Sequence, residues 1–127
     1  MYADLDLWLA LLKDDDWLAD RAEGLLREHE GDLEVSLATF IELFLVEERF
    51  AFDRERAVTA ILEMATFPSD PDVIYQASEN IGEGLNTFDA FHAALSGGSI
   101  ISSDGAYDTL GGVRRVRLEP DGEASEE

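Results

Sequence analysis

The chain has 127 residues, of which 46% are hydrophobic and 30% are charged, a balance typical of a single globular domain rather than a disordered chain. It contains no cysteine, which excludes disulfides, thiolate metal sites and cysteine nucleophiles. Asp and Glu number 29 against nine Lys and Arg, so the formal net charge is −20, which argues against a basic surface for nucleic acid.

The acidic residues are spread along the whole chain, and Lys13 is the single lysine. This pattern favours adaptation to high salt, where a Debye length of about 3 Å at 1 M screens the self-repulsion. An acidic protein of an ordinary cell is the alternative. The chain lacks both a run of the ~18 apolar residues that a membrane span needs and the basic region of a signal peptide. We therefore expect a cytoplasmic protein without a membrane partner.

The beginning of the chain alternates short extended segments with helical periodicity. Residues 2–5 are apolar enough to predict a buried strand, and apolar residues then recur at helical spacing over residues 5–12. Asp15 or Asp16 can cap a second helix. A turn and a short strand over residues 33–36 follow.

The middle of the chain is predominantly helical. Residues 40–50 are apolar almost all round and predict a helix, and Asp53 can cap the next one. Residues 64–68 form a weak edge strand in this interpretation. Asp70 and Pro71 then begin another helix, since proline suits a first helical position.

The last part of the chain returns to strands. Thr87 is the predicted cap of a helix over residues 89–96, which a Gly-Gly pair ends. Strands are predicted at residues 99–102 and 113–118. Strands that alternate with helices imply a parallel sheet covered by helices on both faces.

We expect one domain over residues 1–118, because no linker or repeat interrupts this stretch. Residues 119–127 are acidic and carry no apolar anchor, which predicts a solvated, disordered tail.

Four acidic residues fall in segments whose apolar neighbours predict burial; these four predicted acids are Asp4, Glu42, Asp89 and Asp104. A buried carboxylate is costly unless it is paired or bound to a metal. Asp4 and Asp104 fall at the C-terminal ends of predicted parallel strands, the edge where ligands bind in open α/β sheets. Glu42 and Asp89 fall in the first turns of helices that could approach that edge.

Several carboxylate oxygens without thiols suit a hard cation such as Mg²⁺ or Mn²⁺, and such a site suits phosphodiester hydrolysis. The alternative is structural. Acids at the ends of segments also cap helices, favour helix dipoles or open turns.

Four segments of the sequence together resemble the PIN-domain ribonucleases, most closely the small prokaryotic members that include VapC-type toxins. They are YADLD at residues 2–6, SLATFIEL at 36–43, TFDAFHAA at 87–94 and IISSDGAYD at 100–108. The resemblance covers residues 1–118. It implies a three-layer α/β/α sandwich around a central parallel sheet and a divalent-metal-dependent nuclease that hydrolyses RNA.

The resemblance also implies a role for each of the four predicted acids. They match the four family acids in order, and would hold Mg²⁺ or Mn²⁺ and support the attack of water on the phosphodiester. Ser102 matches a Ser or Thr that precedes the fourth acid by two positions and orders the site by hydrogen bonding. Asp6 falls where many members carry Asn, and is expected to support the site.

Three functions remain open at this stage. The first is the ribonuclease toxin of a toxin–antitoxin pair, a homodimer blocked by a small antitoxin protein. The second is a PIN nuclease of RNA processing. The third is a non-catalytic PIN-fold binding module, which is favoured by the acidity and by Leu5, where the family usually has Thr.

The nine basic residues include two arginine clusters, at residues 49–56 and 114–117. Either cluster could contact phosphate. Ion pairs with the abundant acids are the alternative.

Overall fold

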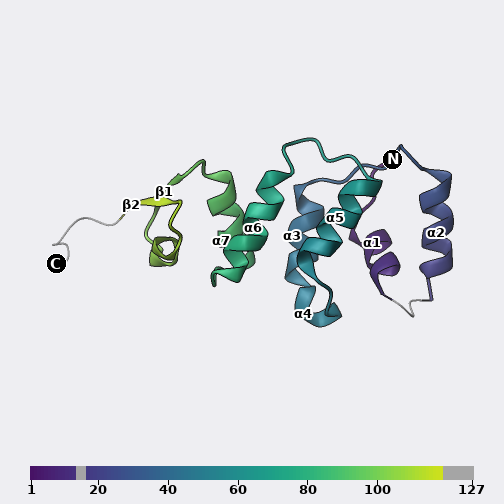
Figure 1. Ribbon diagram of the computed structural model, residues 1–127, viewed down its shortest axis with the longest axis horizontal. Helices are drawn as coiled ribbons and strands as arrows, with labels where there is room; N and C mark the ends of the chain where they lie inside the picture. Colours follow the sequence, from purple (N-terminus) through teal and green to yellow (C-terminus); the bar gives the residue numbers. More distant parts are fainter. Residues whose placement is uncertain (14–16, 119–127) are drawn as a thin grey trace. The chain divides into compact units, whose positions relative to one another are not determined.

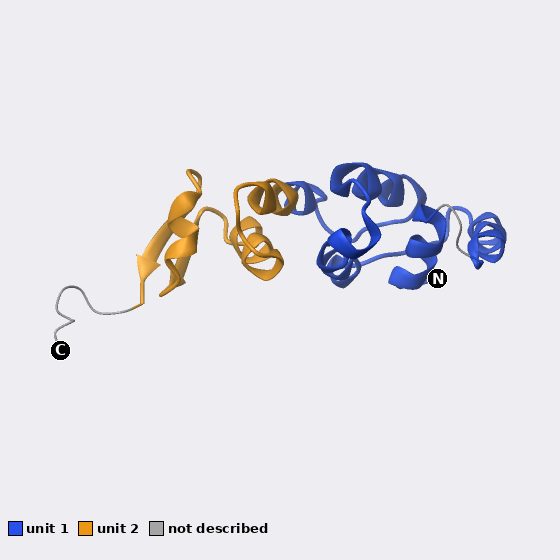
Figure 2. Ribbon diagram, turned by 90° about the horizontal axis from the view of Figure 1, so that it is seen from below, with its two compact units in different colours: residues 1–75 blue, residues 76–127 orange. Residues whose placement is uncertain are grey.

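The structure is a computed structural model that describes residues 1–13 and 17–118 (Figure 1). The chain divides into two compact units, Met1–Tyr75 and Gln76–Glu127, drawn in blue and orange in Figure 2. The predicted caps Asp15 and Asp16 and the predicted tail lie outside the described residues. The single domain over residues 1–118 stays a prediction.

Unit 1 is mainly helical. Its helices are α1 (Leu5–Leu12), α2 (Ala19–Glu28), α3 (Leu37–Leu45), α4 (Glu47–Phe50) and α5 (Arg54–Met64), and α6 (Asp72–Gly82) begins in it. The predicted cap Asp53 is confirmed, since its Oδ1 accepts a hydrogen bond from the Arg56 backbone N–H at 3.0 Å. The single helix predicted over residues 40–50 is wrong, because the helix is interrupted at Val46, which ends α3 and precedes α4.

Three extended segments of unit 1 pair in parallel, with Glu34 between Tyr2 and Thr66. The Ala3 N–H donates to the Glu34 carbonyl at 3.0 Å, and the Thr66 N–H donates to the Leu33 carbonyl at 2.8 Å. The predicted strands at these three places are therefore reduced to isolated bridges.

The core of unit 1 forms where α1 packs against α2 and α3. Its fully buried apolar side chains include Trp8, Val35, Phe40, Leu43, Val58, Ile61 and Ile74. Phe40 meets the ring of Phe67 edge to face at a centroid distance of 5.7 Å. These contacts come from the apolar periodicity of the helices, which places one stripe of each helix inward.

Unit 2 holds the end of α6, then α7 (Thr87–Leu95), β1 (Ser99–Ser102), the 3₁₀ helix η1 (Gly105–Thr109) and β2 (Arg114–Arg117). β1 and β2 pair in parallel, with Ile101 opposite Val116. Gly97 and Gly98 follow α7 with φ of 70° and 101°, a conformation that favours glycine and ends the helix as predicted. The predicted cap Thr87 is wrong, because Asn86 caps α7.

The described residues thus form a mixed α/β structure with seven α-helices and a small two-stranded parallel sheet. Every pairing in them is parallel, as predicted. Neither unit by itself builds the expected three-layer sandwich around a central sheet. The extended segments are too short for one, because helix caps follow at once: Asp4 begins α1 directly after Ala3, and Ser36 begins α3 directly after Val35. Over the described ranges, no helix has the length and apolar character needed to cross a bilayer.

Candidate functional site

The Asp89 carboxylate is held at both of its oxygens. The Tyr107 hydroxyl donates to Oδ1 at 3.1 Å, and the Asn86 side-chain amide donates to Oδ2 at 3.1 Å. In return, Asn86 Oδ1 accepts from the Asp89 backbone N–H at 2.9 Å and so caps α7. Asp89 is half-buried in the first turn of this helix, where the helix dipole favours a negative charge.

Tyr107 lies at the centre of this arrangement with only 4% of its surface exposed. Burial, the hydrogen bond to Asp89 and the charges of Asp89 and Asp104 together raise the pKa of Tyr107 from 10.0 to about 12. The phenol therefore stays protonated and remains a donor at neutral pH. The charges of both carboxylates act on this hydroxyl, and Asp89 is the one that accepts its hydrogen bond.

Asp104 caps η1. Its Oδ1 accepts from the Ala106 backbone N–H at 2.9 Å, and its own N–H donates to Ser102 Oγ at 2.9 Å. Ser102 thus fixes the backbone where β1 ends, and its role in ordering a metal site stays a prediction. The alternative interpretation of Asp104 as a residue that opens a turn is also realised.

Arg115 of β2 bonds both to η1 and to the end of β1. Its Nε and Nη2 donate to the two oxygens of Asp108 at 3.0 and 2.9 Å, and its Nη1 donates to the Ser102 carbonyl at 3.0 Å. The hydrogen bond from Arg115 holds the pKa of Asp108 below its usual value, and the charges of Arg115 and Arg117 act in the same direction. Arg115 is thus part of an ion pair, as is Arg54, which donates to Glu47 at 2.8 Å.

In unit 1, Asp4 caps α1. Its Oδ1 accepts from the Asp6 backbone N–H at 2.9 Å, and both side chains are exposed. Asp4 directly follows the bridge between Tyr2 and Glu34, so the predicted position at the end of an extended segment is correct. Asp6 contributes its backbone to this turn.

Glu42 is exposed in the middle of α3, not in the first turn as predicted, because the helix begins at Leu37. A group of hydroxyls lies at the start of the same helix. Tyr2 Oη is 2.8 Å from Ser36 Oγ and 3.2 Å from Thr39 Oγ1.

The burial expected for the four predicted acids is wrong for three of them. Asp4, Glu42 and Asp104 are exposed, and Asp89 is half-buried. The apolar neighbours that suggested burial point inward from the other side of the same turn or helix, as Leu43 does beside Glu42. Their exposure removes the argument that only a metal could make these carboxylates tolerable.

The donor chemistry nevertheless fits a hard cation in unit 2. Asp89 and Asp104 each carry a carboxylate with about four acceptor positions, so the bonds described leave some of them available. Within either unit, the part of the chain that the structure describes holds no group of three or more Asp, Glu or His side chains arranged for a metal ion. Mg²⁺ suits such a sparse set, because it usually keeps several waters and takes one or two carboxylates.

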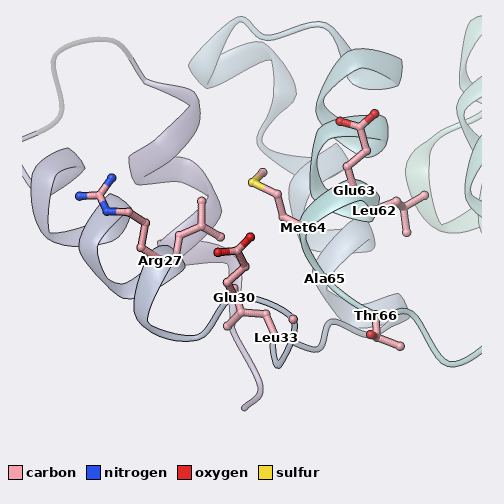
Figure 3. Close-up of a pocket in the computed structure, with 10 residues that line it drawn as sticks. Arg27, Glu30, Leu33, Leu62, Glu63, Met64, Ala65 and Thr66 are labelled. Atoms are coloured by element: carbon pink, nitrogen blue, oxygen red, sulfur yellow. The ribbon is translucent and has the colours of Figure 1, made fainter.

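Two clefts in the structure lie away from the four predicted acids. One, of about 610 Å³ in unit 1, is lined by the end of α2 with Arg27 and Glu30 and by the end of α5 with Glu63 and Met64 (Figure 3). The other, of about 570 Å³ in unit 2, is lined by α6 and by the glycine-rich turns at 97–98 and 111–112. Neither has one of the four acids in its lining.

The sequence did not point to Asn86 and Tyr107, the two residues that bond the Asp89 carboxylate. Asn86 carries a recognisable signal, since Asn before a helix with an acid three residues later is a capping pattern. Tyr107 carries none, because its contact with Asp89 joins residues 18 positions apart.

The protein-family models include none that matches this chain, and a search of curated proteins finds no match either.

Proposed function

We propose that this protein is a divalent-metal-dependent endoribonuclease with a PIN-like fold. The observation that supports the proposal most directly is that the carboxylate of Asp89, one of the four predicted acids, is held at both oxygens by Tyr107 and Asn86. The resemblance of the four sequence segments supplies the reaction and the substrate class.

The two acids of unit 2 have tasks that their hydrogen bonds support. Asp89, oriented at both oxygens, and Asp104, fixed as a cap, would hold Mg²⁺ or Mn²⁺. The resemblance also assigns metal-ligand roles to Asp4 and Glu42, the two exposed acids of unit 1. When bound, the cation lowers the pKa of water and neutralises charge on the phosphodiester, so the site needs no histidine base.

The three-layer α/β/α sandwich is part of the same proposal. It is supported by the parallel pairings inside each unit, because parallel strands need helices on both faces. The bridges of unit 1 and the β1–β2 pair of unit 2 agree with such a sheet in two respects: their strands run parallel, and helices connect extended segments.

RNA binding to a chain of net charge −20 requires screening of the long-range repulsion. At molar salt the Debye length is about 3 Å, so repulsion between exposed charges is largely removed. Arg54 and Arg115 form ion pairs with acids, so they support the fold rather than a phosphate site.

For the biological role we propose a toxin of the VapC type, acting as a homodimer and blocked by a small antitoxin. Exposed apolar side chains suit such contacts, among them Phe88 and Leu95 on α7 and the pair Ile101 and Val116 on the sheet. Sedimentation in molar KCl tests the dimer directly. Two alternatives differ from this role in what they bind. A nuclease of RNA processing would have no antitoxin partner, and a non-catalytic binding module would have no affinity for the metal.

The proposal is tested by Mn²⁺ calorimetry in molar KCl, with RNA cleavage measured in the same buffer. The variants are Asp89→Asn and Asp4→Asn, with Asp20→Asn on the exposed face of α2 as a matched control. We expect the wild type and the control to bind Mn²⁺ and cleave RNA, and both site variants to lose affinity and activity. Unchanged cleavage by Asp4→Asn and Asp89→Asn would refute the site. Absence of both binding and cleavage in the wild type would favour the binding module.

A further inference from the structure

We infer that Tyr107 is a positioning residue of the metal site, whose hydroxyl sets the orientation of the Asp89 carboxylate. The inference rests on the proposed function, because it assigns a role toward the cation that Asp89 would hold.

The geometry fixes the carboxylate from two sides. Tyr107 reaches Oδ1 from η1, and Asn86 reaches Oδ2 from the residue before α7. Asn86 is itself immobilised, because its Oδ1 accepts the Asp89 N–H at 2.9 Å. With a donor on each oxygen, rotation of the Asp89 carboxylate would break at least one hydrogen bond.

The hydroxyl of Tyr107 orients the Asp89 carboxylate, whereas its ring packs in the core of unit 2. The ring of Tyr107 is buried in unit 2, where phenylalanine would fill nearly the same volume. A buried hydroxyl needs a partner, and Asp89 is the partner that it has.

Such a contact matters for a metal ligand. Hydrogen bonds to ligating carboxylates orient them and tune the metal, and their loss typically weakens metal affinity by about 10- to 100-fold. Tyr107 would leave the remaining acceptor positions of Asp89 directed away from η1, so that the cation meets a fixed oxygen rather than a rotating one.

The test uses the full chain and the substitution Tyr107→Phe, which removes one oxygen atom. Tyr75→Phe is the matched control, because the Tyr75 hydroxyl lies 2.7 Å from Thr59 Oγ1 on a different pair of helices. Mn²⁺ affinity is measured by calorimetry in molar KCl, folding by thermal unfolding, and the tyrosine environment by near-ultraviolet difference absorbance on addition of Mg²⁺.

We expect Tyr107→Phe to bind Mn²⁺ about tenfold or more weakly than the wild type and Tyr75→Phe to bind equally well. The tyrosine difference signal should be present in the wild type and Tyr75→Phe, and absent in Tyr107→Phe and Asp89→Asn. If Tyr107→Phe unfolds, the signal still tests the inference in the folded proteins, because a wild type that binds Mn²⁺ without a tyrosine difference signal would overturn it.

Two results would overturn the inference in distinguishable ways. If Asp89→Asn loses Mn²⁺ binding while Tyr107→Phe keeps the wild-type affinity, the metal site stands and Tyr107 has only a packing role. If the wild type does not bind Mn²⁺, or Asp89→Asn binds it equally well, the proposed site fails and the role of Tyr107 fails with it.

Discussion

Asp4 of unit 1 and Asp104 of unit 2 have the same local geometry in different surroundings. Each follows an extended segment that pairs in parallel, and each accepts the backbone N–H two residues ahead at 2.9 Å. Both side chains are exposed, but the charge of Asp104 also contributes to the raised pKa of Tyr107, the residue that bonds Asp89. Helix capping alone explains Asp4, but it does not explain the contacts of Asp89 with Tyr107 and Asn86.

The difference shows what a capping acid reveals by itself. A cap uses one carboxylate oxygen and is worth about 1 kcal/mol to its helix, whatever else the residue does. Only the contacts beyond the cap separate a structural acid from one that can bind a ligand. Unit 2 has such contacts, and for unit 1 they remain a prediction from the sequence.

The largest expected effect is a loss of RNA cleavage without a loss of stability, which distinguishes an acid that binds a ligand from one that only caps a helix. Asparagine caps a helix about as well as aspartate, so Asp4→Asn and Asp104→Asn should leave the melting temperature nearly unchanged. Both should reduce RNA cleavage by at least ~100-fold, the upper range for loss of a group that supports a metal. Cleavage rates and thermal unfolding of the same samples check this. Full activity in Asp4→Asn would make it a cap and nothing more.

The second comparison is between the cores of the units. Phe40 in unit 1 is fully buried against Phe67, and Phe91 in unit 2 is 2% exposed. Each substitution, Phe40→Ala or Phe91→Ala, should lower the free energy of unfolding by about 3–5 kcal/mol through lost contacts and a cavity. Urea titration measures the loss, with Phe88→Ala on the exposed face of α7 as the control. A loss below ~1 kcal/mol at Phe91 would contradict the packing of unit 2.

A smaller effect is expected at Asn80, a buried polar residue of unit 2. Its Nδ2 donates to the Ala90 carbonyl at 3.0 Å and its Oδ1 accepts from Gln76 at 3.2 Å, so it joins α6 to α7. Asn80→Ala should reduce the free energy of unfolding by about 1–3 kcal/mol, because the Ala90 carbonyl loses this donor. Gln76→Ala, at the exposed end of the same chain of bonds, should cost less. Equal losses would argue against the buried contact.

The smallest expected effect is the loss of folding stability when Tyr107 ionises at alkaline pH. Its folded pKa of about 12 lies above the ordinary 10.0, so the folded state keeps a proton that the unfolded state has lost between these values. The stabilisation is present in full below pH 10 and is lost as the pH rises toward 12. Asp89→Asn should lower the pKa of Tyr107, since it removes a charged acceptor. Phenolate absorbance during a pH titration, with Tyr107→Phe as the blank, measures the change.

Local signals predicted the helices well. The apolar periodicity of α1 and the cap at Asp53 depend on neighbours within four residues, and both are confirmed. The strand at residues 99–102 is also confirmed, because an apolar pair after two glycines marks it. Predictions failed where two local signals compete, as at Val46, where one apolar stretch contains the end of one helix and the start of another.

The site was predictable only in part. The order and type of the four acids came from the sequence, but their exposure did not, because an apolar neighbour on a helix can face inward while the acid faces solvent. The contacts of Asp89 with Tyr107 and of Arg115 with Ser102 join different elements, and no spacing rule specifies such pairs.

The two tryptophans of the chain lie in opposite environments. Trp8 is 1% exposed and, among the described residues, its indole N–H has no hydrogen-bond partner, whereas Trp17 is 88% exposed. Their fluorescence should therefore divide into a blue-shifted, quencher-protected emission and a red-shifted emission that iodide reaches. The protein carries its own optical reporter of whether the core around α1 is intact, at any salt concentration and without a label.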